Sequence, residues 1–190
     1  MQLTVRITGE RKLIQHNGRL ANPIDPYSRA LKEHTSKRKK TDEDHVTIMQ
    51  LEARAGCYET EDGMLGVPNV AVWRSIAEAA TVFKRGKDIK KAVMHEDAIT
   101  PLEIDGRSVA CDEWLTDPNH IDYRAVRVGM ARVMRSRPVI PAGWSSVHTF
   151  EVFDDVIDLR DLVPILERAG RLVGIMEMRP TCGTFRVDIE

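Results

Sequence analysis

The last forty-odd residues constrain the fold of this chain more than any other stretch. Residues 144–153 carry apolar side chains at near-alternating positions, which predicts a strand. Asp158 can cap a helix that runs to Ala169, and Gly170 can end it. A loop with several glycines follows, and residues 184–189 predict a closing strand. This order of strand, helix, loop and strand predicts half of a sheet with a helix packed against it.

The loop before the closing strand contains two arginines, Arg171 and Arg179, among Gly170, Gly174 and Gly183. Glycine allows the backbone to adopt positive φ angles or to approach another chain closely. The planar guanidinium group of arginine presents several donors that suit phosphate oxygens. We expect the loop to belong to the framework of the fold, with Arg171 and Arg179 as secondary phosphate contacts.

The amino-terminal part supplies a strand and two helices. Apolar and polar residues alternate at the start of residues 3–15, which predicts a strand. Pro26 suits the first turn of one helix. A second helix begins after Thr41, which forms a capping-box pattern with Asp44, and Gly56 can end it.

The middle of the chain adds a third helix and a long basic strand. The helix opens at Pro68, and a buried stripe of apolar residues reaches Phe83. Residues 95–122 predict an irregular insertion with short strands at 99–104 and 107–111. Residues 123–141 predict one long strand, in which Gly129 marks a bulge or bend.

The predicted fold class is α+β. If residues 17–66 and 95–122 are treated as a helical and an irregular insertion, the core comprises residues 1–16, 67–94 and 123–190. The core then reads βαββαβ, which is the ferredoxin-like, RRM-like arrangement. The whole chain of 190 residues is interpreted as one domain.

Composition excludes several classes of protein. Apolar residues make up 42% and charged residues 30% of the chain, as in globular proteins. No segment approaches the about 20 apolar residues of a membrane helix, and the first residues lack the apolar core of a signal peptide. The three cysteines lie far apart, which indicates neither a zinc site nor a disulfide framework. We therefore expect a cytoplasmic protein without a structural metal site.

Positive charge is concentrated in three blocks, although the net charge is only −1. Segregated charge of this kind can produce one strongly positive face. The basic residues are Lys37, Arg38, Lys39 and Lys40 in the first block, Lys84, Arg85, Lys87, Lys90 and Lys91 in the second, and Arg124, Arg127, Arg132, Arg135 and Arg137 in the third.

Each block has a structural as well as a functional interpretation. The first could be a solvated linker, and the second could complement the dipole at a helix end. The third favours binding of phosphates, because five arginines follow one another on strand-like sequence with almost no acidic residue between them. Its alternative is a surface paired with the acidic segment 154–161.

Catalytic motifs are absent, and one histidine remains as a candidate. The chain has no P-loop, no G-x-S-x-G, no H-E-x-x-H and no RNP1 motif. A metal-independent ribonuclease needs a side chain that moves the 2′-hydroxyl proton. His16, in the loop after the first strand, is the best-placed candidate for that role, and a bystander residue is the alternative.

Two segments resemble a known family. The turn and helix GVPNVAVWRSIAEAA at 66–80 and the loop and strand GRLVGIMEMRPTCGTFRV at 170–187 are similar to the RAMP superfamily, and within it to backbone subunits of CRISPR effector complexes. The resemblance implies a ferredoxin-like core, binding of RNA or single-stranded DNA along one face, side-by-side self-assembly and no cofactor. The small size also resembles proteins encoded by bacteriophages.

The sequence thus favours a non-enzymatic protein that binds RNA or single-stranded DNA largely without reading its sequence. We expect it to self-associate or to join a multi-subunit complex, without a membrane partner, in the cytoplasm of a bacterial or phage-infected cell. One alternative is a metal-independent RAMP-type endoribonuclease that uses His16. The other is a phage anti-defence protein that acts by protein–protein interaction with a CRISPR complex, which the acidic segment 154–161 favours.

Overall fold

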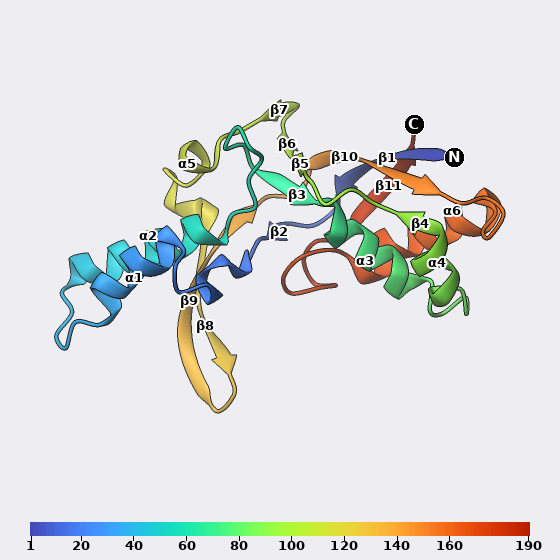
Figure 1. Ribbon diagram of the computed structural model, residues 1–190. Helices are drawn as coiled ribbons and strands as arrows, with labels where there is room; N and C mark the ends of the chain where they lie inside the picture. Colours follow the sequence, from blue (N-terminus) through green and yellow to red (C-terminus); the bar gives the residue numbers. More distant parts are fainter.

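The computed structural model describes residues 1–190 and confirms the α+β class (Figure 1). Its main sheet is antiparallel, and β4 (Val93–Met94) pairs with one end of β10. In spatial order the other strands of this sheet are β11 (Phe185–Ile189), β1 (Gln2–Gly9), β10 (Ser145–Val152), β6 (Glu103–Ile104) and β7 (Arg107–Ser108).

Apolar and polar side chains alternate along β1 and point to opposite faces of the sheet. Leu3, Val5 and Ile7 are buried, whereas the threonines and the arginine between them lie on the opposite, polar face. The register of β1 with β10, in which Leu3 faces Phe150, places the apolar side chains of both strands on the same side. Phe150 and Phe185 are both buried.

Three helices contribute to the core beneath the apolar face: α3 (Asn69–Ala79), α4 (Gly86–Ala92) and α6 (Leu159–Arg168). In α6, Leu162, Ile165 and Leu166 lie on one side of the helix and are buried, each contributing about 1.5–3 kcal/mol through burial. The predicted N-terminal cap of α6 is correct, because the Asp158 side chain accepts a hydrogen bond from the Arg160 backbone, but Gly170 does not end the helix. A single π-helical turn, Ala169–Val173, continues the helix.

The predicted apolar stripe of α3 is only partly correct. Val72 and Ile76 are buried, and Trp73 packs against the core while its indole N–H donates to the Val93 carbonyl at 2.7 Å. Phe83 is exposed, because α3 ends at Ala79 and the chain turns at Lys84, where φ is +59°.

The basic segment predicted as one core strand instead forms a hairpin, β8 (Ile121–Val128) and β9 (Ala131–Ile140). Gly129, with φ of +60°, lies in the turn between the strands and is not a bulge. The hairpin does not join the main sheet, and only β2 (Leu13–Ile14) pairs with its base. The position beside β10 that this segment was expected to fill is occupied by β4 and β6.

A helical hairpin extends from the same end of the molecule as β8 and β9 (Figure 1). It consists of α1 (Pro26–Thr35) and α2 (Asp42–Gly56), preceded by the 3-10 turn Gly18–Ala21. The predicted capping box is present, because Thr41 and Asp44 exchange side-chain to backbone hydrogen bonds. No residue of α1 is buried, so the hairpin has little core of its own.

The insertion after β4 is irregular, as predicted. It contains β5 (Ile99–Pro101), β6 and β7, the short helix α5 (Cys111–Trp114) and the 3-10 turn Pro118–His120. β5 pairs with β3 (Gly66–Pro68), which leads into α3. None of the helices combines the length and apolar character that crossing a bilayer requires.

A buried polar network links β10 to the start of α3. His148 Nδ1 lies 2.7 Å from Asn69 Oδ1, and His148 Nε2 lies 2.8 Å from Ser146 Oγ. An amide oxygen can only accept, so Nδ1 carries the proton and Nε2 accepts from the serine. Burial lowers the pKa of His148 to about 4.

We expect His148 to make the folding stability depend on pH. The imidazole is neutral in the folded protein, whereas in the unfolded chain it takes up a proton near pH 6.5. Stability is therefore fully present above pH 6.5 and falls as the pH decreases towards 4, by about 3 kcal/mol in total. Urea unfolding between pH 7.5 and 4.5 measures this loss. The neutral variant His148→Gln should lose less over the same interval, and an equal loss in both proteins would contradict the assignment.

Candidate nucleic-acid interface

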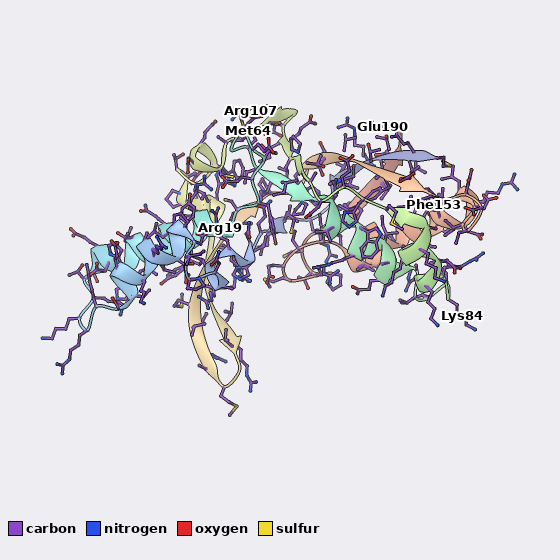
Figure 2. The ribbon with its side chains drawn as sticks, in the orientation of Figure 1. Arg19, Met64, Lys84, Arg107, Phe153 and Glu190 are labelled. Carbon is purple, nitrogen blue, oxygen red and sulfur yellow. The ribbon has the colours of Figure 1, made fainter.

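A basic groove of about 770 Å³ lies between α3, the turn into α4 and the carboxyl-terminal loop. Arg74, Lys84, Lys87 and Lys90 line it, and none of them forms an ion pair with a carboxylate. Figure 2 shows Lys84 pointing outward at this end of the molecule. Unpaired cations grouped in a concave surface create a strong local positive potential. We name this surface the basic groove.

Local structure brings these cations together. Lys87 and Lys90 lie three residues apart on α4 and therefore share one face of the helix. Lys84 occupies the left-handed turn just before α4, and Arg74 lies on the exposed side of α3. Arg179 enters from the carboxyl-terminal loop, where Glu78 of α3 holds its guanidinium at 3.3 Å.

A smaller pocket of about 170 Å³ continues the basic groove. Arg74 and Arg179 line both hollows, and His16, Tyr58 and Glu177 line only the smaller one. The Tyr58 hydroxyl donates to the His16 carbonyl at 3.4 Å, and burial raises the pKa of Tyr58. We name this hollow the Tyr58 pocket.

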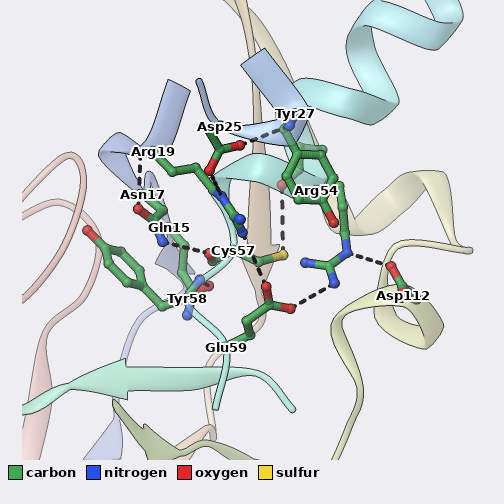
Figure 3. Close-up of polar contacts among 11 residues, drawn as sticks. Gln15, Asn17, Arg19, Asp25, Tyr27, Arg54, Cys57, Tyr58, Glu59 and Asp112 are labelled. Carbon is green, nitrogen blue, oxygen red and sulfur yellow. Dashed lines mark hydrogen bonds and ion pairs between the residues drawn. The ribbon is translucent and has the colours of Figure 1, made fainter. Parts of the chain in front are cut away.

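The Tyr58 pocket rests on a polar network around Gln15 (Figure 3). Gln15 is fully buried, its amide nitrogen donates to the Gly66 carbonyl at 2.8 Å, and its oxygen accepts from the Tyr58 backbone at 2.9 Å. Further along the network, Arg54 binds Glu59 at 2.7 Å and Asp112 at 2.5 Å, which ties α2 to the insertion. These contacts hold the backbone of Tyr58 in place.

The arginines of the β8–β9 hairpin do not form the purely positive surface that the sequence predicts. Arg124 and Arg137 both bind Asp122, and Arg137 also binds Glu177 at 3.3 Å. Arg135 binds Glu52 of α2 at 2.9 Å. Arg137 is only 5% exposed, and its guanidinium group binds carboxylates inside the protein. We therefore leave it out of the proposed interface.

Two arginines of the β8–β9 hairpin, Arg127 and Arg132, are not neutralised by carboxylates. They face each other across β8 and β9 near the turn, both are exposed, and neither binds a carboxylate. They therefore remain candidates for phosphate contacts.

The other predicted basic residues lie in several places. Arg85 is neutralised by Asp88 at 3.0 Å and Asp161 at 2.7 Å. Lys91 and Arg171 are exposed without carboxylate partners but do not line the basic groove.

The first basic block forms the tip of the helical hairpin, far from α4 (Figure 1). There Lys37 binds Asp44 at 2.5 Å and, together with His34, holds the pKa of that carboxyl well below its usual range. Arg38, Lys39 and Lys40 are exposed and bind no carboxylate.

Two lining residues, Arg74 of the basic groove and Tyr58 of the Tyr58 pocket, were not predicted from the sequence. Arg74 had one usable signal, since it is the only cation in residues 69–83. Tyr58 had none, because its position depends on Gln15, 43 residues away in the chain.

Nothing in the structure groups three or more histidine, cysteine, aspartate or glutamate side chains as a metal site would. No protein-family model matches the sequence, and no curated protein matches it. The interpretation of the interface therefore depends on its geometry and charge.

Proposed function

We propose that the protein is a non-enzymatic subunit that holds single-stranded RNA or DNA in the basic groove, in the cytoplasm of a bacterial or phage-infected cell. The observation that carries this proposal is the set of four unpaired cations, Arg74, Lys84, Lys87 and Lys90, on one concave surface. Lysine and arginine contacts to phosphates position a strand without reading its bases. The proposed binding is therefore largely independent of sequence.

Aromatic rings support a single strand as the ligand. Trp73 lines the basic groove and Tyr58 lines the adjoining pocket. Unpaired bases stack on aromatic rings, and stacking tolerates any base. The polar face of the sheet offers no such platform, because its residues on β1 are Thr4, Arg6 and Thr8.

We further propose that the core is ferredoxin-like and related to the RAMP proteins. The order β11–β1–β10, with β4 on the far side of β10, supports this arrangement. So do the connections, because α3 and α4 lie between β1 and β4, and α6 lies between β10 and β11. On this interpretation β4 replaces the long strand expected at residues 123–141. Self-association is part of the same proposal.

The adjoining pocket supports a second candidate, a metal-independent endoribonuclease. It places His16 beside Tyr58 and Glu177, with Arg74 and Arg179 available for phosphate. General acid–base catalysis requires a titratable side chain within reach of the proton that it transfers, and the neighbouring arginines could hold the phosphate.

One experiment tests both candidates. A fluorescent single-stranded RNA and the equivalent DNA are titrated with protein in EDTA at several salt concentrations, and the RNA is then separated on a denaturing gel. We expect binding that weakens steeply with salt, and intact RNA, because phosphate contacts release counterions. Undetectable binding at low salt would exclude the proposed function. Cleavage that disappears in His16→Ala would favour the nuclease.

A further inference from the structure

A second hollow lies at the end of the molecule opposite the helical hairpin. It has a volume of about 670 Å³ and opens beside β4 and β10. Glu96, Glu151 and His95 line it together with polar and apolar side chains, and no lysine or arginine does. The one cation at its wall is the amino-terminal ammonium group, which donates to the Val152 carbonyl at 2.6 Å. We name this hollow the acidic cleft.

Residues around the acidic cleft have the character of an interface. Asp97, next to Glu96, is exposed and forms no ion pair, and the same is true of Asp154 and Asp155 in the loop after β10. Met94 and Phe153 beside them are 42% and 41% exposed, and Figure 2 shows Phe153 next to β4. Exposed apolar side chains within a polar rim are typical of protein-binding sites.

The edge of β10 at the cleft also lacks a partner. β4 pairs with Glu151 and Val152, and β6 pairs with Ser145. No strand pairs with the residues between these positions on that edge. β5 lies beside this edge without pairing with it, so the backbone groups of these residues have no partner in a β-ladder.

The chain itself carries a segment of complementary charge. Arg38, Lys39 and Lys40 form the exposed tip between α1 and α2, without carboxylate partners. The tip lies at one end of the molecule, and the acidic cleft lies at the other, near the amino terminus and β4 (Figure 1).

We propose that the helical-hairpin tip of one copy binds in the acidic cleft of a second copy. The two surfaces are different and lie at opposite ends, so the contact is heterologous and can repeat from copy to copy. This inference rests on the self-association in the proposed function and specifies the surfaces that mediate it. Because the contact is electrostatic and exposed, it weakens with salt.

Variants with reversed charges test the contact between the hairpin tip and the acidic cleft. One variant, Arg38→Glu/Lys39→Glu/Lys40→Glu, reverses the tip, and the other, Glu96→Lys/Asp97→Lys/Glu151→Lys, reverses the cleft. Molar mass is measured by analytical ultracentrifugation, after nuclease treatment, over a concentration series at low and high salt. We expect wild-type protein to form oligomers at low salt, and each variant alone to associate at least tenfold more weakly. An equimolar mixture of the two variants should regain assembly, because each reversed surface then meets its opposite.

Several outcomes would overturn the contact. These are a wild-type protein that stays monomeric at every concentration, variants that assemble like wild type, and a mixture that stays monomeric although both variants retain their melting temperatures. Binding of a short oligonucleotide by the same variants separates this inference from the proposed function. Assembly without oligonucleotide binding would contradict the basic groove alone, and binding without assembly would contradict only the contact.

Discussion

Replacing Lys84, Lys87 and Lys90 together with glutamine is expected to weaken the binding of a single-stranded oligonucleotide about 100-fold at 0.1 M salt. These side chains line the basic groove and have no carboxylate partners, so all three are free to contact phosphates. For single strands, each phosphate contact contributes about 0.7 to the slope of log affinity against log salt. Losing three contacts should lower the slope by about 2, which corresponds to about two orders of magnitude between 1 M and 0.1 M salt.

Fluorescence anisotropy over a salt series measures both the affinity and the slope. A matched control, Lys12→Gln/Arg29→Gln/Lys32→Gln, removes the same number of unpaired charges from exposed positions that do not line the groove. We expect its slope to remain that of wild type. If both triple variants lost the same affinity, net charge rather than the groove would control binding, and the proposed site would be wrong.

Replacing Gly183 with alanine is expected to lower the free energy of unfolding by about 2–5 kcal/mol. Gly183 has φ of +71°, a conformation that costs an L-residue about 1–2 kcal/mol. A Cβ atom at this position would lie 2.0 Å from the Ile175 carbonyl oxygen, so the backbone would have to move. Movement is resisted because the Gly183 N–H donates to the Lys12 carbonyl and its carbonyl accepts from the Ile175 N–H, each at 2.9 Å. Overpacking of this kind adds about 1–3 kcal/mol.

Gly63→Ala separates the two contributions. Gly63 has φ of +77° but no neighbouring atom within 4 Å of an added Cβ, so only the backbone strain remains, at about 1–2 kcal/mol. Urea unfolding compares the variants, and for Gly183→Ala the melting temperature should fall by roughly 10 °C. Equal destabilisation of the two variants would show that the close approach to Ile175 is relieved without cost.

Because the loop that contains Gly183 also carries Arg179 into the basic groove, the oligonucleotide affinity of Gly183→Ala should fall as well.

Local signals predicted most elements of the fold. Thr41 and Asp44 specify the start of α2, and Asp158 specifies the start of α6, because an N-terminal cap depends on residues a few positions apart. Alternation along β1 predicted which face would be buried. The β8–β9 hairpin was predicted as one strand because a glycine among alternating apolar and polar residues is compatible with either a bulge or a turn. The position of β4 beside β10 had no usable signal, since β4 is two residues long, and the predicted short strand that contains β6 gave no indication of its partner.

The sequence by itself determined the first strand, the helix after Asp158, the last strand and the glycine loop before it, together with the position of the second basic block in the chain. Only the tertiary structure decided which cations are free. Arg135 is neutralised by a glutamate 83 residues earlier and Arg137 by a glutamate 40 residues later, whereas Lys84, Lys87 and Lys90 meet no carboxylate. Helix and strand formation is governed by neighbours in the chain, but the charge that a surface presents depends on which distant segments the fold brings together.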